Sequence, residues 1–166
     1  FDTEHRRKVL EEVLQERART GRVDGPVQQR ASYGTVGCVA RDQQGRLAAA
    51  TSTGGLTGKR WGRVGDTPVV GAGNYADGAV AVSCTGTGEQ FLRHAVAHSI
   101  SARVQLAGET LAQAADALVR RTLKPDDGGL IAVDRAGNLV APFNTEGMYR
   151  GLADSNGRFV VRIFED

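Results

Sequence analysis

Threonines beside glycines are the most unusual feature of this sequence, because their hydroxyls can act as nucleophiles. Seven of the twelve threonines fall between positions 35 and 87: Thr35, Thr51, Thr53, Thr57, Thr67, Thr85 and Thr87. A threonine hydroxyl reacts poorly until a base takes its proton, and the α-amine of the same residue can be that base. This amine titrates at about pH 8, which suits proton transfer at neutral pH.

A free α-amine on a threonine requires that the peptide bond before it be cut, and Gly34-Thr35 fits this requirement. Gly34 tolerates strained backbone geometry, and the residues before it have the composition of a flexible linker. Thr35 begins a predicted strand, which would hold the hydroxyl rigidly. From composition alone, the alternative is a threonine at an ordinary strand edge.

Two further motifs could bind a charged ligand. Residues 83–89 read S-C-T-G-T-G-E and join a predicted strand to a predicted helix, so the backbone N–H groups around Thr85 and Gly86 could hold an oxyanion. No lysine follows these glycines, which argues against a phosphate-binding P-loop. The alternative interpretation is a helix start that needs glycine only for close packing.

The second motif, Gly62 to Asp66, reads G-R-V-G-D. The guanidinium of Arg63 can grip a carboxylate through two hydrogen bonds, and the carboxylate of Asp66 can pair with an ammonium. Together they match the two charges of an amino-acid zwitterion. The alternative is an exposed ion pair in a loop, which would contribute little to stability.

Metal and thiol chemistry are not expected. His94 and His98 are four residues apart in a predicted helix, but a zincin would need glutamate where Ala95 stands, and a third ligand is not evident. Cys38 and Cys84 lie in apolar strand-like segments, where we expect small buried hydrophobic residues. We therefore expect no metal and no cofactor.

The composition is that of an ordinary globular protein. The chain has 166 residues, with 21 Lys+Arg against 19 Asp+Glu and a net charge of +2, which does not indicate a nucleic-acid or membrane partner. Two cysteines cannot form a disulfide framework, so we expect reduced thiols and a cytoplasmic location. The chain begins with Phe1 and not methionine, and we expect it to be a piece of a longer protein.

Hydrophobic periodicity and turn residues predict the elements that must position these groups. Helices are expected at 4–20, 89–104 and 109–123, with a linker at 21–34. Strands are expected at 36–41, 47–53, 79–84, 130–133, 139–142 and 159–164. Two hairpin loops each open with aspartate and close with glycine, which favours antiparallel sheet and an α+β fold over a doubly wound parallel one.

Taken together, five motifs in this order closely resemble the plant-type (type 2) asparaginases, also called isoaspartyl peptidases. They are G-T-V-G at 34–37, L-A-A-A-T-S-T-G-G at 47–55, G-R-V-G-D at 62–66, S-C-T-G-T-G-E at 83–89 and P-F-N-T-E-G-M at 142–148. The resemblance covers nearly the whole chain. It implies an N-terminal nucleophile hydrolase with a four-layer αββα sandwich, in which an antiparallel sheet is flanked by helices.

In such enzymes a precursor cuts itself before a threonine, and the two products stay together as α and β subunits. The resemblance therefore implies that residues 1–34 are the C-terminal helix and linker of the α subunit and that residues 35–166 are the β subunit. Most of the α subunit would precede this chain and would be its partner. A dimer of αβ units is also implied.

The resemblance gives each candidate residue a role. Thr35 is the nucleophile, made N-terminal by cleavage after Gly34, and Thr53 assists it. Arg63 binds the α-carboxylate of the substrate and Asp66 its α-amine. Thr85 and Gly86 line the oxyanion pocket and contact the side-chain amide of the substrate.

The implied reaction is hydrolysis of L-asparagine or a β-aspartyl (isoaspartyl) dipeptide to L-aspartate through an acyl-enzyme on Thr35. A glycosylasparaginase is an alternative, although such enzymes typically read S-T-N-G and T-G-D-G where this chain has S-T-G-G at 52–55 and T-G-T-G at 85–88. The same differences argue against a protease of the taspase type. A non-catalytic fragment that only binds or packs is the remaining alternative.

Overall fold

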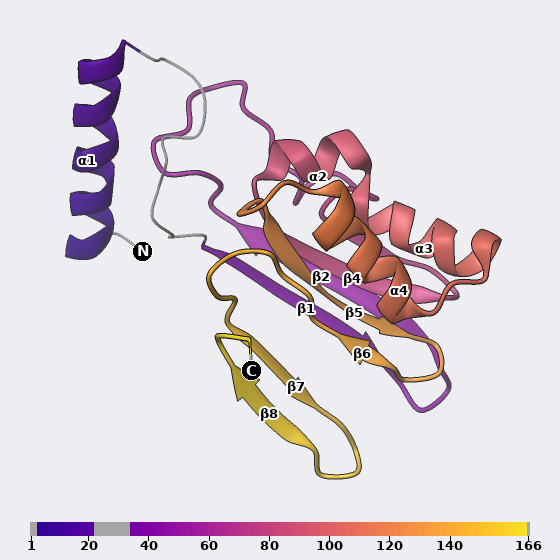
Figure 1. Ribbon diagram of the computed structural model, residues 1–166. Coiled ribbons are helices and arrows are strands. Elements are labelled where there is room, and N and C mark those ends of the chain that lie inside the picture. The colour runs from indigo at the N-terminus through magenta and orange to yellow at the C-terminus, as the bar shows by residue number, and fades with distance from the viewer. Residues whose placement is uncertain (1–2, 22–33, 166) are drawn as a thin grey trace.

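One helix, four strands, a group of helices and four more strands follow one another along the described chain, close to the predicted order, and the strands pair antiparallel (Figure 1). The structure is a computed structural model that describes residues 3–21 and 34–165. It is an α+β fold, which confirms the predicted fold class. Most of the predicted linker, residues 22–33, lies outside the described residues.

The described elements have the following bounds. The helices are α1 (Glu4–Thr20), α2 (Gly88–His94), α3 (Val96–Ala107) and α4 (Leu111–Asp116), and α4 continues into a π-helical turn, η1 (Ala117–Thr122). The strands are β1 (Thr35–Arg41), β2 (Leu47–Thr53), β3 (Asn74–Ala76), β4 (Val80–Gly86), β5 (Gly128–Asp134), β6 (Leu139–Val140), β7 (Arg150–Ala153) and β8 (Phe159–Arg162).

Three hairpins share one turn design. In each, an aspartate side chain accepts at least one backbone N–H from the loop, and a glycine with positive φ closes the turn. The pairs are Asp42 with Gly45, Asp134 with Gly137, and Asp154 with Gly157. The first two were predicted. The third connects β7 to β8, and β7 was missed by the sequence analysis although its loop carries the same signal.

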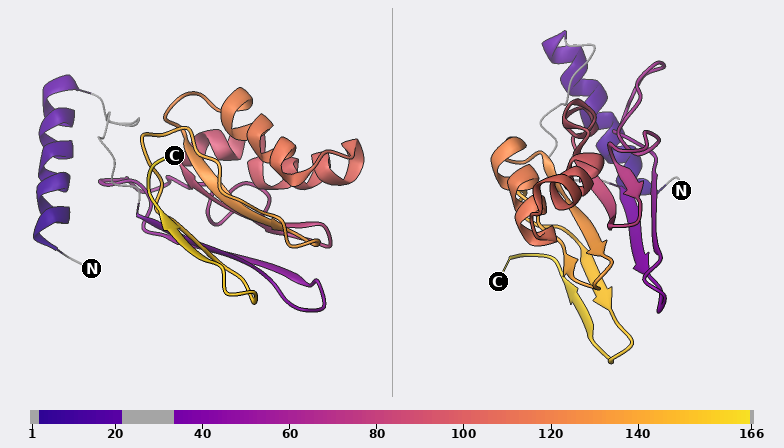
Figure 2. Two further views of the ribbon diagram at one scale, coloured as in Figure 1. Left: turned by 60° about the horizontal axis from the view of Figure 1, so that its bottom comes forward. Right: turned by 90° about the vertical axis from the view of Figure 1, so that its right-hand side faces the viewer.

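The layers follow from what covers each face of the four-stranded sheet β3-β4-β5-β6. One face packs against α2, α3 and α4 through the main core, which includes Phe91, Ile100, Val80 and Leu130, all fully buried. The other face packs against the β1–β2 hairpin. Figure 2 shows this order of helices, sheet and hairpin from the side. The described residues thus form three layers.

Close contact between the hairpin and the sheet depends on small residues. A β-carbon on Gly37 would overlap the side chain of Ser83 in β4, and Thr51 Oγ1 lies 2.8 Å from Ser83 Oγ. Side chains alternate along a strand, so Val36 and Cys38 point to the opposite, uncovered side of the hairpin. Cys38 is exposed and only Cys84 is buried. The expectation that Cys38 is buried was therefore wrong.

The predicted helix at 89–104 is broken at Ala95, where φ is +44°. The backbone N–H groups of Ala97 and His98 then donate to the carbonyls of Ala72 and Gly71, at 3.1 and 2.8 Å, so tertiary contacts start a new helix there. His94 ends α2 and His98 belongs to α3, which corrects their placement on one helix.

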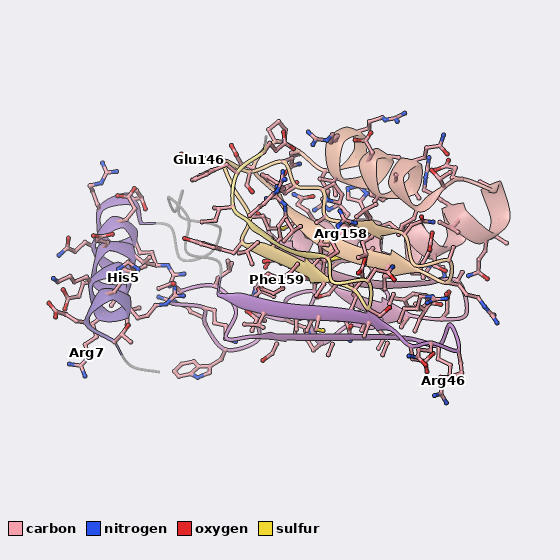
Figure 3. The ribbon with its side chains drawn as sticks, turned by 90° about the horizontal axis from the view of Figure 1, so that it is seen from below. His5, Arg7, Arg46, Glu146, Arg158 and Phe159 are labelled. Atoms are coloured by element: carbon pink, nitrogen blue, oxygen red, sulfur yellow. The ribbon has the colours of Figure 1, made fainter. Side chains whose placement is uncertain are left out.

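Helix α1 lies beside these three layers. Figure 3 labels His5 and Arg7 on this helix. Its side chain Val13 is buried, and Arg17 Nη1 donates to the carbonyl oxygen of Gly58 at 2.6 Å. The helix therefore rests on the loop that follows β2. A membrane-crossing helix would have to be longer and more apolar than any helix of the described residues.

Candidate active site

Thr35 and Thr53 are cross-strand partners at the open end of the β1–β2 hairpin. The hydroxyl of Thr35 donates to Thr53 Oγ1 at 3.3 Å. The hydroxyl of Thr53 in turn points to the carbonyl oxygen of Gly34, at 3.5 Å, and accepts the backbone N–H of Gly55 at 3.0 Å. A hydroxyl has one proton and two acceptor lone pairs, so these three contacts use its full capacity.

The loop after β2 carries Arg63, whose guanidinium makes two hydrogen bonds to Glu89 in the first turn of α2. Arg63 Nε lies 2.8 Å from Glu89 Oε1, and Arg63 Nη2 lies 3.2 Å from Glu89 Oε2. This contact lowers the pKa of Glu89 below its ordinary value, chiefly through the hydrogen bond with Arg63. Glu89 is therefore a carboxylate at neutral pH and neutralises part of the charge of Arg63.

Glycines leave the space that the guanidinium occupies. A β-carbon on Gly55 would lie 3.3 Å from Arg63 Nη1, and one on Gly65 would lie 2.6 Å from the same nitrogen. A β-carbon on Gly88 would lie 3.0 Å from Arg63 Nη2. Larger residues at these positions would displace the guanidinium, so the glycines shape the site as well as the turns.

Asp66 is the buried acid of the same loop, with 7% of its surface exposed. Its carboxylate lies beneath Gly73 and Gly88, where a β-carbon on Gly88 would be 2.8 Å from Asp66 Oδ1. Burial raises the pKa of Asp66, although its own backbone N–H and the charge of Arg63 oppose that rise. Within the described part of the chain, Asp66 Oδ2 is buried without a hydrogen-bond partner.

Thr85 and Gly86 end β4, beside the start of β5. They pair with Gly129 and Gly128, and the two backbones approach so closely that a β-carbon on Gly86 would overlap the carbonyl of Asp127. Gly86 has a φ of +143°, which a residue with a β-carbon rarely adopts. The glycines therefore allow β4 to turn directly into α2.

These groups gather at one end of the sandwich. Gly55 lies two residues after Thr53, and Gly88 lies two residues after Gly86, and both flank the guanidinium of Arg63. The ends of β2 and β4 are therefore neighbours, with Arg63 between them. The structure brings together the Thr35–Thr53 pair, the loop with Arg63 and Asp66, and the turn after Thr85 and Gly86.

The arrangement combines a threonine hydroxyl, a cation and a buried acid, all from residues that the sequence analysis named as candidates. Among the described residues, no three His, Cys, Asp or Glu side chains gather where they could hold an ion. The His98 ring instead packs edge-on against Tyr75, with 5.4 Å between the ring centres.

The sequence analysis missed Glu89, although it quoted the motif that ends in this residue. Helix-start glutamates are common and usually interact with the helix dipole, so the residue alone gave no signal. The pairing becomes visible only when the loop with Arg63 folds back onto α2. The roles of Gly55, Gly65 and Gly88 as neighbours of the guanidinium were missed for the same reason.

Comparison with known proteins gives the chain a family. The family model described as Asparaginase matches residues 1–163. Similar curated proteins are the isoaspartyl peptidase of Salmonella typhimurium, 56% identical over 128 residues, the isoaspartyl peptidase/L-asparaginase of Xenopus laevis, 44% over 126, and the plant-type L-asparaginase of Thermococcus kodakarensis, 43% over 116.

These three matches cover 75%, 74% and 69% of this chain, but only 41%, 40% and 38% of the relatives, respectively. The chain thus spans about two fifths of the length of the curated relatives it matches. The family match nevertheless extends over almost all of its residues, including the threonine pair and the loop with Arg63 and Asp66. This chain therefore belongs to the asparaginase family that includes isoaspartyl peptidases and plant-type L-asparaginases.

Proposed function

We propose that this chain is part of a longer, autoprocessing threonine amidohydrolase that releases L-aspartate from L-asparagine, from β-aspartyl dipeptides or from both. The observation that carries the proposal is the contact between the hydroxyls of Thr35 and Thr53, next to the carbonyl oxygen of Gly34. The names of the relatives, isoaspartyl peptidase and L-asparaginase, support the same substrates.

Self-cleavage is the first proposed step. The hydroxyl oxygen of Thr35 attacks the carbonyl carbon of Gly34, and the Thr53 hydroxyl donates to the carbonyl oxygen as negative charge develops there. The bond from this carbon to the Thr35 nitrogen breaks, and the nitrogen takes the proton that the attacking hydroxyl loses and becomes a free amine. Water then hydrolyses the resulting ester. Residues 1–34 become the end of an α subunit, and residues 35–166 become the β subunit.

Hydrolysis uses the amine that cleavage has released. Thr35 Oγ1 attacks the side-chain carbonyl carbon of the substrate while the Thr35 amine takes the hydroxyl proton. The amine then passes this proton to the leaving ammonia or peptide amine. Water attacks the acyl-enzyme, and L-aspartate and the Thr35 hydroxyl are regenerated. Neither step requires a metal or an organic cofactor.

Substrate binding follows from the charges around the pair. Arg63 binds the α-carboxylate, and the carboxylate of Asp66 binds the α-ammonium. Thr85 and Gly86, at the end of β4, line the pocket for the oxyanion and the side-chain amide. These roles depend on a small substrate that carries both charges.

The remaining part of the longer protein has a structural role in this proposal. The described residues form helices, a sheet and a hairpin whose outer side, with Val36 and Cys38, is exposed. We propose that the N-terminal portion of the α subunit covers this side and completes a four-layer αββα sandwich. The complete protein then assembles as a dimer of αβ units.

Mass spectrometry of the purified full-length protein tests the proposal. Two fragments separated at the bond between Gly34 and Thr35 are expected, together with release of ammonia from L-asparagine or of aspartate from a β-aspartyl dipeptide. Thr35→Ala should abolish both activities. Thr35→Ser keeps a hydroxyl and an amine and should retain part of each. A full-length protein that is intact and inert would favour the non-catalytic alternative.

A further inference from the structure

The contact between Arg63 and Glu89 uses only part of the guanidinium. Glu89 takes Nε and Nη2, at 2.8 and 3.2 Å. The third nitrogen, Nη1, faces the space above Gly55 and Gly65, because β-carbons on these residues would lie 3.3 and 2.6 Å from it. The backbone N–H of Gly55 donates to Thr53 Oγ1, so Gly55 is a neighbour both of Nη1 and of the threonine pair.

The position of Glu89 is fixed by the fold and not by the pair itself. Its backbone is in the first turn of α2, directly after Gly88, and Gly88 is buried next to both Arg63 and Asp66. Arg63, in contrast, comes from a loop rich in glycine, and a loop side chain of this length has many rotamers. The helix therefore supplies the fixed end of the contact, and the loop supplies the adaptable end.

Stability does not account for this pair. The side chains of Arg63 and Glu89 are 20% and 48% exposed, and ion pairs with such exposure typically contribute between about 0 and 1 kcal/mol. A bidentate contact does, however, fix the plane of a guanidinium. Orientation of Arg63 is therefore the main physical effect of Glu89.

We propose that Glu89 is a positioning residue for recognition of the substrate α-carboxylate: it holds Arg63 through Nε and Nη2 so that Nη1 faces the substrate. Glu89 does not touch the reacting atoms. The inference rests on the proposed function and adds the residue that decides how strongly the site selects substrates with a free α-carboxylate.

The test compares two substrates in the full-length protein. L-asparagine has the α-carboxylate, and L-aspartic acid diamide carries a neutral carboxamide in its place. In Glu89→Gln, we expect KM for L-asparagine to rise about tenfold and kcat to change less than about threefold. The inhibition constant of L-aspartate should rise by about the same factor as KM. For the diamide, kcat/KM should stay within about twofold of the wild type, because the lost orientation serves only the carboxylate.

A matched control is available in the same chain. Arg103 and Glu109 form a similar bidentate pair, at 2.8 and 2.7 Å, between α3 and the start of α4. Glu109→Gln removes the same charge away from the site and should leave both substrates unaffected. Glu89→Ala removes both acceptor oxygens and should change KM at least as much as Glu89→Gln.

Three outcomes would overturn the inference. An equal loss on both substrates would mean that Glu89 only supports the structure. A lower KM for L-asparagine in Glu89→Gln would mean that Glu89 competes with the substrate for Arg63. Unchanged kinetics in both Glu89 variants would exclude any role. These outcomes need an active wild type, whereas a wild type that hydrolyses neither L-asparagine nor a β-aspartyl dipeptide overturns the proposed function and the inference with it.

Discussion

The hydroxyl of Thr53 lies between two oxygens, Thr35 Oγ1 at 3.3 Å and the carbonyl oxygen of Gly34 at 3.5 Å. Because Thr53 accepts from Thr35 and from the N–H of Gly55, its single proton is directed to Gly34. Thr53 can therefore donate a hydrogen bond to the carbonyl group of the bond to be cut and accept one from the hydroxyl of Thr35. A change at Thr53 should affect self-cleavage and hydrolysis together.

Thr53→Val tests this expectation because valine has the shape of threonine without the hydroxyl. Loss of one donor at a developing oxyanion typically slows a reaction by about 100-fold, and we expect that effect on self-cleavage of the full-length protein. The intact and cut forms can be followed over time by mass spectrometry. Thr53→Ser should restore most of the rate. Cleavage of Thr53→Val at the wild-type rate would contradict the assignment.

Asp66 should show opposite effects on stability and on binding. Burial raises the pKa of Asp66 above its ordinary 3.8, so this carboxyl loses its proton less readily in the folded state than in the unfolded chain. Its contribution to stability is therefore greatest below the unfolded pKa and is lost as the pH rises through the folded pKa. At neutral pH the buried carboxylate destabilises the fold.

Asp66→Asn should accordingly stabilise the full-length protein at pH 7 by about 1 kcal/mol, since a neutral amide is easier to bury than a carboxylate. The difference from the wild type should shrink as the pH is lowered to about 4. Urea denaturation at both pH values measures it. KM for L-asparagine should rise, because the partner of the substrate ammonium is lost. A less stable variant at pH 7 would mean that the carboxylate has a favourable buried partner.

At the scale of elements, the close approach of the paired ends of β4 and β5 depends on Gly86 and Gly128. Both have positive φ, +143° and +141°, and each faces the backbone of the other strand. A side chain at either position would strain its own residue and also overlap the opposite strand. The turn that places Thr85 therefore depends on two glycines that carry no chemistry.

Gly86→Ala should destabilise the full-length protein by at least about 3 kcal/mol, as the sum of backbone strain and overpacking. Gly78→Ala is the control, because a β-carbon on Gly78 meets no atom of the described residues within 4 Å. That variant should stay within about 0.5 kcal/mol of the wild type. The urea midpoints of the two variants provide the comparison. Equal midpoints would exclude the close backbone contact between Gly86 and Gly128.

Elements that depend on local signals were predictable. Helix α1 matches the predicted residues 4–20, and strand β2 matches the predicted 47–53, because period and turn residues agree there. The break at Ala95 was not predictable, since alanine favours helices and the cause lies in the carbonyls of Gly71 and Ala72. Strands β3 and β7 are short and lack clear alternation, so they were missed.

The candidate site was likewise predictable only in part from the sequence. Residue types and their order indicated Thr35, Arg63 and Asp66, because their chemistry is evident from the side chains. The partner of Arg63 was not evident, since Glu89 meets it only through the folded loop. The error on Cys38 has a related cause. Its apolar neighbours indicated burial, but the described residues leave that side of β1 uncovered.

At the scale of the whole molecule, a groove of about 700 Å³ separates the β7–β8 hairpin from β1, β5 and β6. Its lining includes Cys38, Val140, Leu152 and Val160. Figure 3 shows Arg158 and Phe159 on this hairpin. A two-stranded hairpin is rarely stable by itself, and we propose that the rest of a longer protein packs in this groove and on the outer side of β1–β2.

The reactivity of Cys38 tests this packing. In the 166-residue chain alone, Cys38 is exposed and should react readily with a thiol reagent such as Ellman's reagent. In the full-length protein the rate should fall by more than about tenfold, because the N-terminal portion would cover β1. Cys84 provides the internal control, since it is buried and burial raises its pKa well above the ordinary value. Equal rates for Cys38 in both forms would contradict the proposed cover.

The contact of α1 with the loop after β2 has a consequence for any protein cut between Gly34 and Thr35. Arg17 of this helix holds the carbonyl of Gly58, in the segment that joins β2 to Arg63. The severed helix and an incoming amino acid would then act on the same segment. Thermodynamic linkage then requires a reciprocal effect: if the bound helix raises the affinity for the amino acid by some factor, the bound amino acid raises the affinity for the helix by the same factor.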